Sequence, residues 1–208
     1  MMAFDRRGHG RTADTDAPIH YDDMAREAVD VLTDVVGGPS HLVGYSDGGI
    51  VALLVAIARP DLVRTVVVIG TNFHHDGLVE GAFDDLTPDS PDYQMLQQTY
   101  AERSPDGADH FPVVFEKTLT MFSSEPTMTP ADLATIAAPV LVVAGDDDLV
   151  TLGHTCTLYE SLPHGQLAIA PGASHLLPHE QPELLNRLVA DFLEKDGRVE
   201  TLMPLRRH

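Results

Sequence analysis

The chain has 208 residues, of which 43% are hydrophobic and 22% charged, a composition typical of a globular domain that excludes a disordered chain. Its formal net charge of −19 argues against nucleic acid and anionic membranes as partners, because both are polyanions. No apolar run could span a bilayer, the first residues do not form a signal peptide, and the single cysteine, Cys156, excludes an internal disulfide, so we expect a cytoplasmic protein.

Runs with helix-like and strand-like spacing alternate along the first 70 residues. Apolar residues at helical spacing predict a helix over 21–36, which Gly37-Gly38-Pro39 ends. A short strand is expected at 41–44, a helix that is apolar on all sides at 50–58, and a buried β-branched strand at 65–69. This alternation predicts a parallel sheet.

The stretch 71–130 breaks the alternation. It is rich in Asp, Pro and Ser and contains two expected helices, near 92–102 and 111–123. A long excursion between two core strands predicts a cap over the carboxyl edge of the sheet. Thr129 before Pro130 then predicts the start of a further helix, with Thr at the N-cap and Pro at the first helical position.

The last third of the chain returns to strands and helices. Strands are expected at 140–144 and 166–170, and an amphipathic helix at 184–193. The fold class is therefore α/β, a mostly parallel sheet with helices on both faces and a small helical cap. The expected division is a core of residues 1–70 and 131–195, a cap of residues 71–130 and a tail of residues 196–208.

The most specific motif is Gly44-Tyr45-Ser46-Asp47-Gly48, which matches the G-x-S-x-G nucleophile elbow. In such an elbow a serine sits on a strained turn between a strand and a helix, with small neighbours because the two elements crowd together. The expected strand before the motif and the buried helix after it supply this context. The motif predicts that Ser46 is a nucleophile.

A serine hydroxyl is a weak nucleophile and needs a base, which in turn needs an orienting acid. Along a chain with this elbow, the acid follows the Ser and the His follows the acid. Two later loops fit that order. The loop Gly145-Asp146-Asp147-Asp148 follows one expected strand, and His175 follows the next. From spacing alone, any of the three aspartates is a candidate acid for His175.

These motifs, together with Phe4-Asp5-Arg6-Arg7-Gly8-His9-Gly10-Arg11-Thr12, resemble the α/β-hydrolase superfamily in order and spacing. The resemblance implies that the acid is the fourth residue of the Gly-Asp-x-Asp turn, Asp148. It leaves Asp146 as a brace of the loop and Asp147 as a solvated turn residue. The catalytic residues implied are thus Ser46, Asp148 and His175.

The resemblance also implies an oxyanion hole of two backbone N–H groups, one of them from Asp47. The His-Gly loop that supplies the second in relatives has no counterpart here, and neither do their first three strands. We therefore interpret the chain as truncated or begun at a misplaced start codon, and expect it to be a poor catalyst. Residues 2–6 should stand apart from the strand 41–44 or pair with it, and the exposed sheet edge predicts a homo-oligomer.

Within the superfamily, Gly-Tyr-Ser-Asp-Gly-Gly resembles the biphenyl-hydrolase-like branch, which includes valacyclovir hydrolase and related esterases of amino-acid esters. An Asp47 carboxylate could attract a substrate ammonium, or it could only complement the dipole of the following helix. Tyr45 and Phe73 are further candidate substrate contacts. Met121 and Phe122 could line an acyl pocket, or belong to the core of the cap.

The function predicted is hydrolysis of a carboxylic ester of a small molecule through an acyl-serine intermediate. Thioester, amide and carbon–carbon bond hydrolysis use the same three residues, and a non-catalytic binding protein or pseudoenzyme is an alternative of another class. We expect no cofactor and no metal. Adjacent His74 and His75 are interpreted as a polar loop, since no carboxylate spacing around them suggests ligands.

Overall fold

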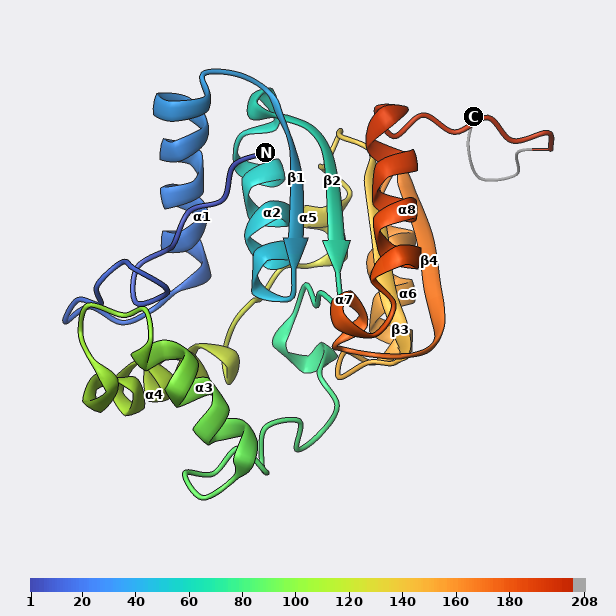
Figure 1. Ribbon diagram of the computed structural model, residues 1–208. Helices are drawn as coiled ribbons and strands as arrows, with labels where there is room; N and C mark the ends of the chain where they lie inside the picture. Colours follow the sequence, from blue (N-terminus) through green and yellow to red (C-terminus); the bar gives the residue numbers. More distant parts are fainter. Residues whose placement is uncertain (204–208) are drawn as a thin grey trace.

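A computed structural model describes residues 1–203 of the chain (Figure 1). Four strands and eight α-helices form in it. The strands are β1 (Ser40–Tyr45), β2 (Val63–Ile69), β3 (Val140–Asp147) and β4 (Gly165–Ser174). The helices are α1 (Tyr21–Asp30), α2 (Asp47–Ala58), α3 (Pro91–Ala101), α4 (Phe111–Phe122), α5 (Pro130–Leu133), α6 (Leu152–Ser161), α7 (Leu177–Glu180) and α8 (Pro182–Glu194). The predicted tail, 196–208, extends beyond the described residues at 204–208.

The four strands form one parallel sheet in the order β1-β2-β3-β4. Helix α2 connects β1 to β2, and α6 connects β3 to β4, as parallel neighbours require. All four strands therefore end at the same edge of the sheet (Figure 1). This is the α/β fold that the sequence predicted.

The two central strands, β2 and β3, present alternate residues to two separate apolar cores. On β2, Val66 and Val68 pack into the core shared with α1, α2, α5 and α6, whereas Val67 and Ile69 pack against α7 and α8. All four side chains are at most 5% exposed. Burial on both faces explains why this strand reads as an unbroken β-branched run and not as an alternating one.

The excursion between β2 and β3 lies beyond the carboxyl ends of the strands, where α3 and α4 form a separate layer (Figure 1). Its aromatic residues pack on one another: Tyr93 meets the rings of Phe111 and Phe115 edge-on at 5.0 and 4.9 Å. Tyr93 is also buried. This part of the chain lies where the sequence predicted a cap, and the boundaries 71 and 130 stay a prediction.

Helices α5 and α6 are among the elements that differ from the sequence analysis. Helix α6 was not predicted, because its sequence LGHTCTLYES combines Gly with Thr and His, which are weak helix formers. Tertiary packing stabilises it through buried Leu158. The helix expected after Thr129 is only one turn, α5, although it has a complete capping box between Thr129 and Asp132.

One edge of the described sheet is β1, and residues 1–6 do not pair with it. They form no strand, and within residues 1–203 no backbone hydrogen bond joins them to β1. The most exposed side chain on the strand is apolar, Val43 at 52% exposure, with Phe4 at 46% in the terminal segment. Of the two arrangements expected for this segment, the one that stands apart is found. In the described part of the chain, no helix is long and apolar enough to cross a bilayer.

Candidate active site

Ser46 occupies the turn between β1 and α2 in a strained conformation. Its φ of 53° and ψ of −120° lie in a region that residues with a Cβ rarely adopt. Its N–H donates to the carbonyl of Ile69 on the neighbouring strand at 2.8 Å. The turn is thereby locked to the sheet, and the side chain projects at the carboxyl edge.

Small residues around Ser46 are required by close backbone approach. A Cβ on Gly44 would lie 2.1 Å from the carbonyl oxygen of Gly48, and one on Gly49 would lie 2.0 Å from Thr71 Oγ1. Gly48, the second glycine of the motif, has open space beside it. The close backbone packing expected around the motif is found at Gly44. On the helix side it is found at Gly49 and not at Gly48.

Three side chains from separate loops meet at this edge of the sheet. His175, after β4, has Nε2 3.1 Å from Ser46 Oγ and Nδ1 2.8 Å from Asp148 Oδ1. The Asp148 side chain is 2% exposed and that of His175 18% exposed. With its hydrogen on Nδ1, the imidazole donates to Asp148 and can accept the proton of Ser46, which is the geometry of a nucleophile, a base and an orienting acid.

The other two aspartates of the loop lie elsewhere. Asp146 Oδ1 accepts from the backbone N–H of Gly172 at 2.7 Å, so it braces the loop that leads to His175. Asp147 is exposed. Asp148 also accepts from the N–H of Val150 at 3.1 Å, which fixes its orientation.

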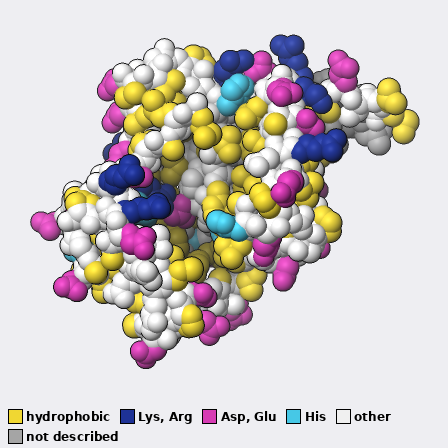
Figure 2. Space-filling view, viewed as in Figure 1, with side chains coloured by type: hydrophobic (Ala, Val, Ile, Leu, Met, Phe, Trp, Pro, Cys, Tyr) yellow, Lys and Arg dark blue, Asp and Glu magenta, His cyan; other side chains and the backbone are white. Residues whose placement is uncertain are grey.

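A pocket of about 120 Å³ opens onto Ser46 and His175. Its apolar wall comes from Leu78, Phe83, Phe122 and Leu149, and its polar part from Tyr21, Asp47, Asn72 and Glu125. The space-filling view shows the surface hollowed between the α3–α4 layer and the sheet core (Figure 2). The pocket therefore lies between core and excursion, next to the nucleophile.

Of the predicted substrate contacts, Asp47 and Phe122 line this pocket and three residues do not. Tyr45 turns toward the imidazole of His175, with ring centroids 5.1 Å apart. Phe73 stacks on His154 with centroids 4.0 Å apart, and Met121 is 2% exposed within the core. None of these three residues lines the pocket, and their assignment as substrate contacts stays a prediction.

The carboxylate of Asp47 has partners for both oxygens. Oδ2 accepts from Arg6 at 2.7 Å, and Oδ1 accepts from the hydroxyl of Tyr21 at 2.7 Å. Burial, followed by the charge of Asp47, raises the pKa of Tyr21, so that hydroxyl stays a donor. Arg6 offsets the charge that was expected to attract an ammonium, and the pair ties the N-terminal segment to the elbow.

The backbone of Asp47 fits its other expected role. It is the first residue of α2, and N–H groups of a first helical turn have no acceptor within the helix. Such a group next to the nucleophile suits an oxyanion, with the positive end of the helix dipole behind it.

Sequence reasoning did not single out Tyr21, Asn72 or Glu125 as pocket residues. Glu125 stands between α4 and α5, and one of its carboxylate oxygens accepts from the backbone N–H of Tyr21 at 3.0 Å. Tyr21 and Glu125 reach the pocket only because the segment between β2 and β3 folds back on the start of α1. Asn72, three residues after the end of β2, was the one most open to detection, because polar residues at the carboxyl edge of a parallel sheet often face its ligand.

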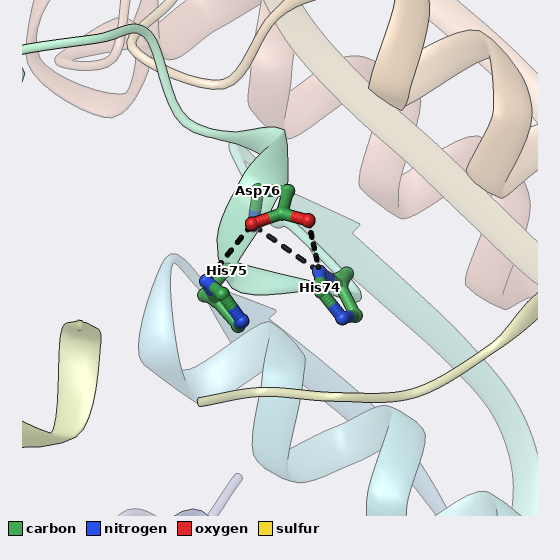
Figure 3. Close-up of side chains that lie close together, drawn as sticks. All are labelled: His74, His75 and Asp76. Carbon is green, nitrogen blue, oxygen red and sulfur yellow. Dashed lines mark hydrogen bonds and ion pairs between the residues drawn. The ribbon is translucent and has the colours of Figure 1, made fainter. Parts of the chain in front are cut away.

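His74, His75 and Asp76 place three potential metal donors within 4.8 Å of one another (Figure 3). Both imidazoles lie near the carboxylate: Asp76 oxygens are 3.4 Å from His74 Nδ1 and 3.1 Å from His75 Nδ1. His74 Nδ1 also accepts from the N–H of Asp76 at 3.2 Å. The structure thus brings a carboxylate to the two histidines, and their interpretation as a polar loop without a metal stays a prediction.

The fold and the site together define a hydrolase of the α/β class. The family model for the alpha/beta hydrolase family matches residues 2–188, and the chain belongs to this family. It is similar to the serine hydrolase BPHL of Mus musculus, with 28% identity over 93% of this chain and 69% of the relative. It is also similar to human epoxide hydrolase 4, with 24% identity over 95% of this chain and 66% of the relative.

Among solved structures, NosK from Streptomyces actuosus superposes with a TM-score of 0.75 and 26% identity, covering 94% of this chain and 85% of that one. The similarity to BPHL agrees with the branch that the sequence motif around Ser46 indicated. One relative is named as a serine hydrolase and another as an epoxide hydrolase. The comparisons therefore support a hydrolase and leave its substrate open.

Proposed function

We propose that the protein is a serine hydrolase that cleaves a carboxylic ester of a small molecule through an acyl-serine intermediate. The observation that carries the proposal is the continuous contact from Ser46 Oγ through the imidazole of His175 to Asp148, at 3.1 and 2.8 Å. Together these three side chains can activate an alcohol near neutral pH, which none of them does alone.

In the proposed reaction, Ser46 Oγ attacks the ester carbonyl carbon while His175 Nε2 takes its proton. The oxyanion that forms is stabilised by the N–H of Asp47. His175 then gives the proton to the departing alcohol, and the acyl group remains on Ser46. Water, activated by the same imidazole, attacks the acyl-serine and releases the acid.

The size of the pocket favours small substrates. Its volume of about 120 Å³ is below the ~300–1,000 Å³ typical of pockets that enclose drug-sized ligands. The apolar wall of Leu78, Phe83 and Phe122 suits a short acyl or alkyl group. We expect turnover of p-nitrophenyl esters to be best with short acyl chains.

Relatives with other reactions do not weaken the assignment of the nucleophile. Epoxide hydrolases of this fold use an aspartate as nucleophile, whereas the elbow here carries Ser46. Thioester, amide and carbon–carbon bond hydrolysis stay alternatives, because they need the same three side chains. A panel of p-nitrophenyl esters, thioesters and anilides of one acyl group would rank them.

The test is labelling with a fluorophosphonate, which reacts quickly only with an activated serine. Wild-type protein should gain one adduct, mapped to Ser46 by mass spectrometry, and lose ester turnover in parallel. Ser46→Ala should not label, and its turnover should fall by several powers of ten. Wild-type protein that neither labels nor hydrolyses any of the panel would favour a pseudoenzyme.

A further inference from the structure

Tyr45 is the last residue of β1 and directly precedes Ser46, yet its side chain reaches the base. Its hydroxyl donates to the backbone carbonyl of His175 at 2.9 Å, across 130 positions of sequence. Its ring lies beside the imidazole, with centroids 5.1 Å apart and planes inclined by 33°. One side chain therefore joins the strand that carries the nucleophile to the loop that carries the base.

Besides the bond from its ring Nδ1 to Asp148, the loop of His175 is held at the preceding residue, Ser174. Both oxygens of Glu180 accept from Ser174, one from its N–H and one from its hydroxyl, each at 2.7 Å. These bonds fix the residue before His175. The carbonyl of His175 itself is bound by Tyr45, so the tyrosine holds the base from the side of the nucleophile.

The contact between Ser46 and His175 cannot by itself keep the two aligned during a reaction. In the proposed mechanism, Ser46 Oγ moves to the substrate carbonyl while His175 keeps its proton for the leaving alcohol. The imidazole must stay in place through this step, and a displacement of 1 Å can cost about a hundredfold in rate. The bond from Tyr45 is independent of Oγ and persists when the direct contact breaks.

The hydroxyl is suited to act as a lasting donor. Burial, and after it the negative charge of Asp148, raises the pKa of Tyr45, so the phenol stays protonated throughout the neutral range. Tyr45 is also 36% exposed, so the hydroxyl is not needed to fill the core.

We propose that Tyr45 is a positioning residue that holds His175 at reaction distance from Ser46 through its hydroxyl bond to the His175 carbonyl. This inference rests on the proposed function. It differs from a role in binding substrate, because Tyr45 does not line the pocket. It acts on the rate of the chemical step and not on affinity.

The test compares Tyr45→Phe, which keeps the ring beside the imidazole and removes only the hydroxyl, with wild type and with Tyr100→Phe. The control also loses one hydroxyl bond, to Asp106 at 3.3 Å, but in the α3–α4 layer. For Tyr45→Phe we expect kcat and the fluorophosphonate labelling rate to fall roughly tenfold to a hundredfold, with KM unchanged. Tyr100→Phe should match wild type in both, and the two variants should melt within a few degrees of each other.

Three outcomes would overturn the inference. Equal labelling rates and kcat in Tyr45→Phe and wild type would remove it while leaving the serine hydrolase in place. A raised KM with unchanged kcat would make Tyr45 a substrate contact, and a loss of activity that only follows a loss of folded protein would make it structural. Wild-type protein that fails to label would instead overturn the proposed function, and the positioning role with it.

Discussion

Gly70 stands directly behind the imidazole of His175, at the end of β2. A Cβ there would lie 2.9 Å from His175 Nδ1 and 3.1 Å from Asp148 Oδ2, and the residue has φ +56°. We predict that Gly70→Ala pushes the base away from Ser46 and lowers kcat/KM by roughly a hundredfold. Ester turnover and fluorophosphonate labelling measure this loss.

Gly37 offers a matched control for that substitution. It has a similar positive φ of +76°, but nothing lies within 4 Å of the position of its Cβ. Gly37→Ala should cost a comparable backbone strain of about 1–2 kcal/mol and leave activity unchanged. If both variants lose activity in proportion to their stability, contact with the imidazole is not the cause.

Asp47 offers a second test at the scale of one residue. Asp47→Asn would remove the negative charge that pairs with the Arg6 guanidinium, now 2.7 Å from Oδ2, and weaken the attachment of the N-terminal segment. We predict a loss of about 1–3 kcal/mol of stability and equal losses of kcat/KM on amine-bearing and neutral esters. Thermal unfolding and paired ester assays measure the two effects.

An effect of Asp47→Asn on only one class of ester would contradict this prediction. A rise in KM confined to amine-bearing esters, with neutral esters unaffected, would mean that the Asp47 carboxylate binds a substrate ammonium despite its ion pair. Arg6→Gln is the matched variant, because it removes the partner and leaves the carboxylate in place.

At the scale of elements, His154 joins α6 to the loop after β2. Its Nε2 accepts from the N–H of Phe73 at 3.1 Å, and burial, followed by the positive charge of His74, lowers its pKa to about 4. Because the unfolded chain takes up the proton near pH 6.5, folding loses stability as the pH falls from about 6.5 to 4. Urea unfolding at several pH values measures this slope.

His154→Gln separates the titration from the hydrogen bond. A glutamine oxygen can accept from Phe73 but binds no proton in this range, so the variant should keep neutral-pH stability and lose much of the slope. An unchanged slope would assign the acid sensitivity to other titrating groups of the chain.

At the scale of the whole molecule, the free side of β1 is the surface where a second copy could pair. Val43 is 52% exposed there, and unpaired strand edges with apolar side chains invite association. We predict concentration-dependent self-association that Val43→Lys abolishes, measured by sedimentation velocity. Val35→Lys changes a still more exposed valine, at 64%, in another segment, and should leave the association as it is.

The alternation of strand-like and helix-like runs was sufficient to predict every strand and most helices, because burial on two faces demands unbroken apolar strands such as Val63–Ile69. Helix α6 escaped detection because packing, and not propensity, stabilises it. The loops bearing Ser46, Asp148 and His175 were predictable for a geometric reason: parallel strands deliver their carboxyl ends to one edge.

The amino-acid sequence by itself determined the nucleophile elbow and the order of acid and base, since both follow from short-range patterns. Only the tertiary structure decided which side chains surround them. Tyr45 faces His175 instead of the pocket, and Glu125 meets Tyr21 from 104 positions away. The physical reason is that a contact between distant segments depends on how whole elements pack, and no local periodicity records that.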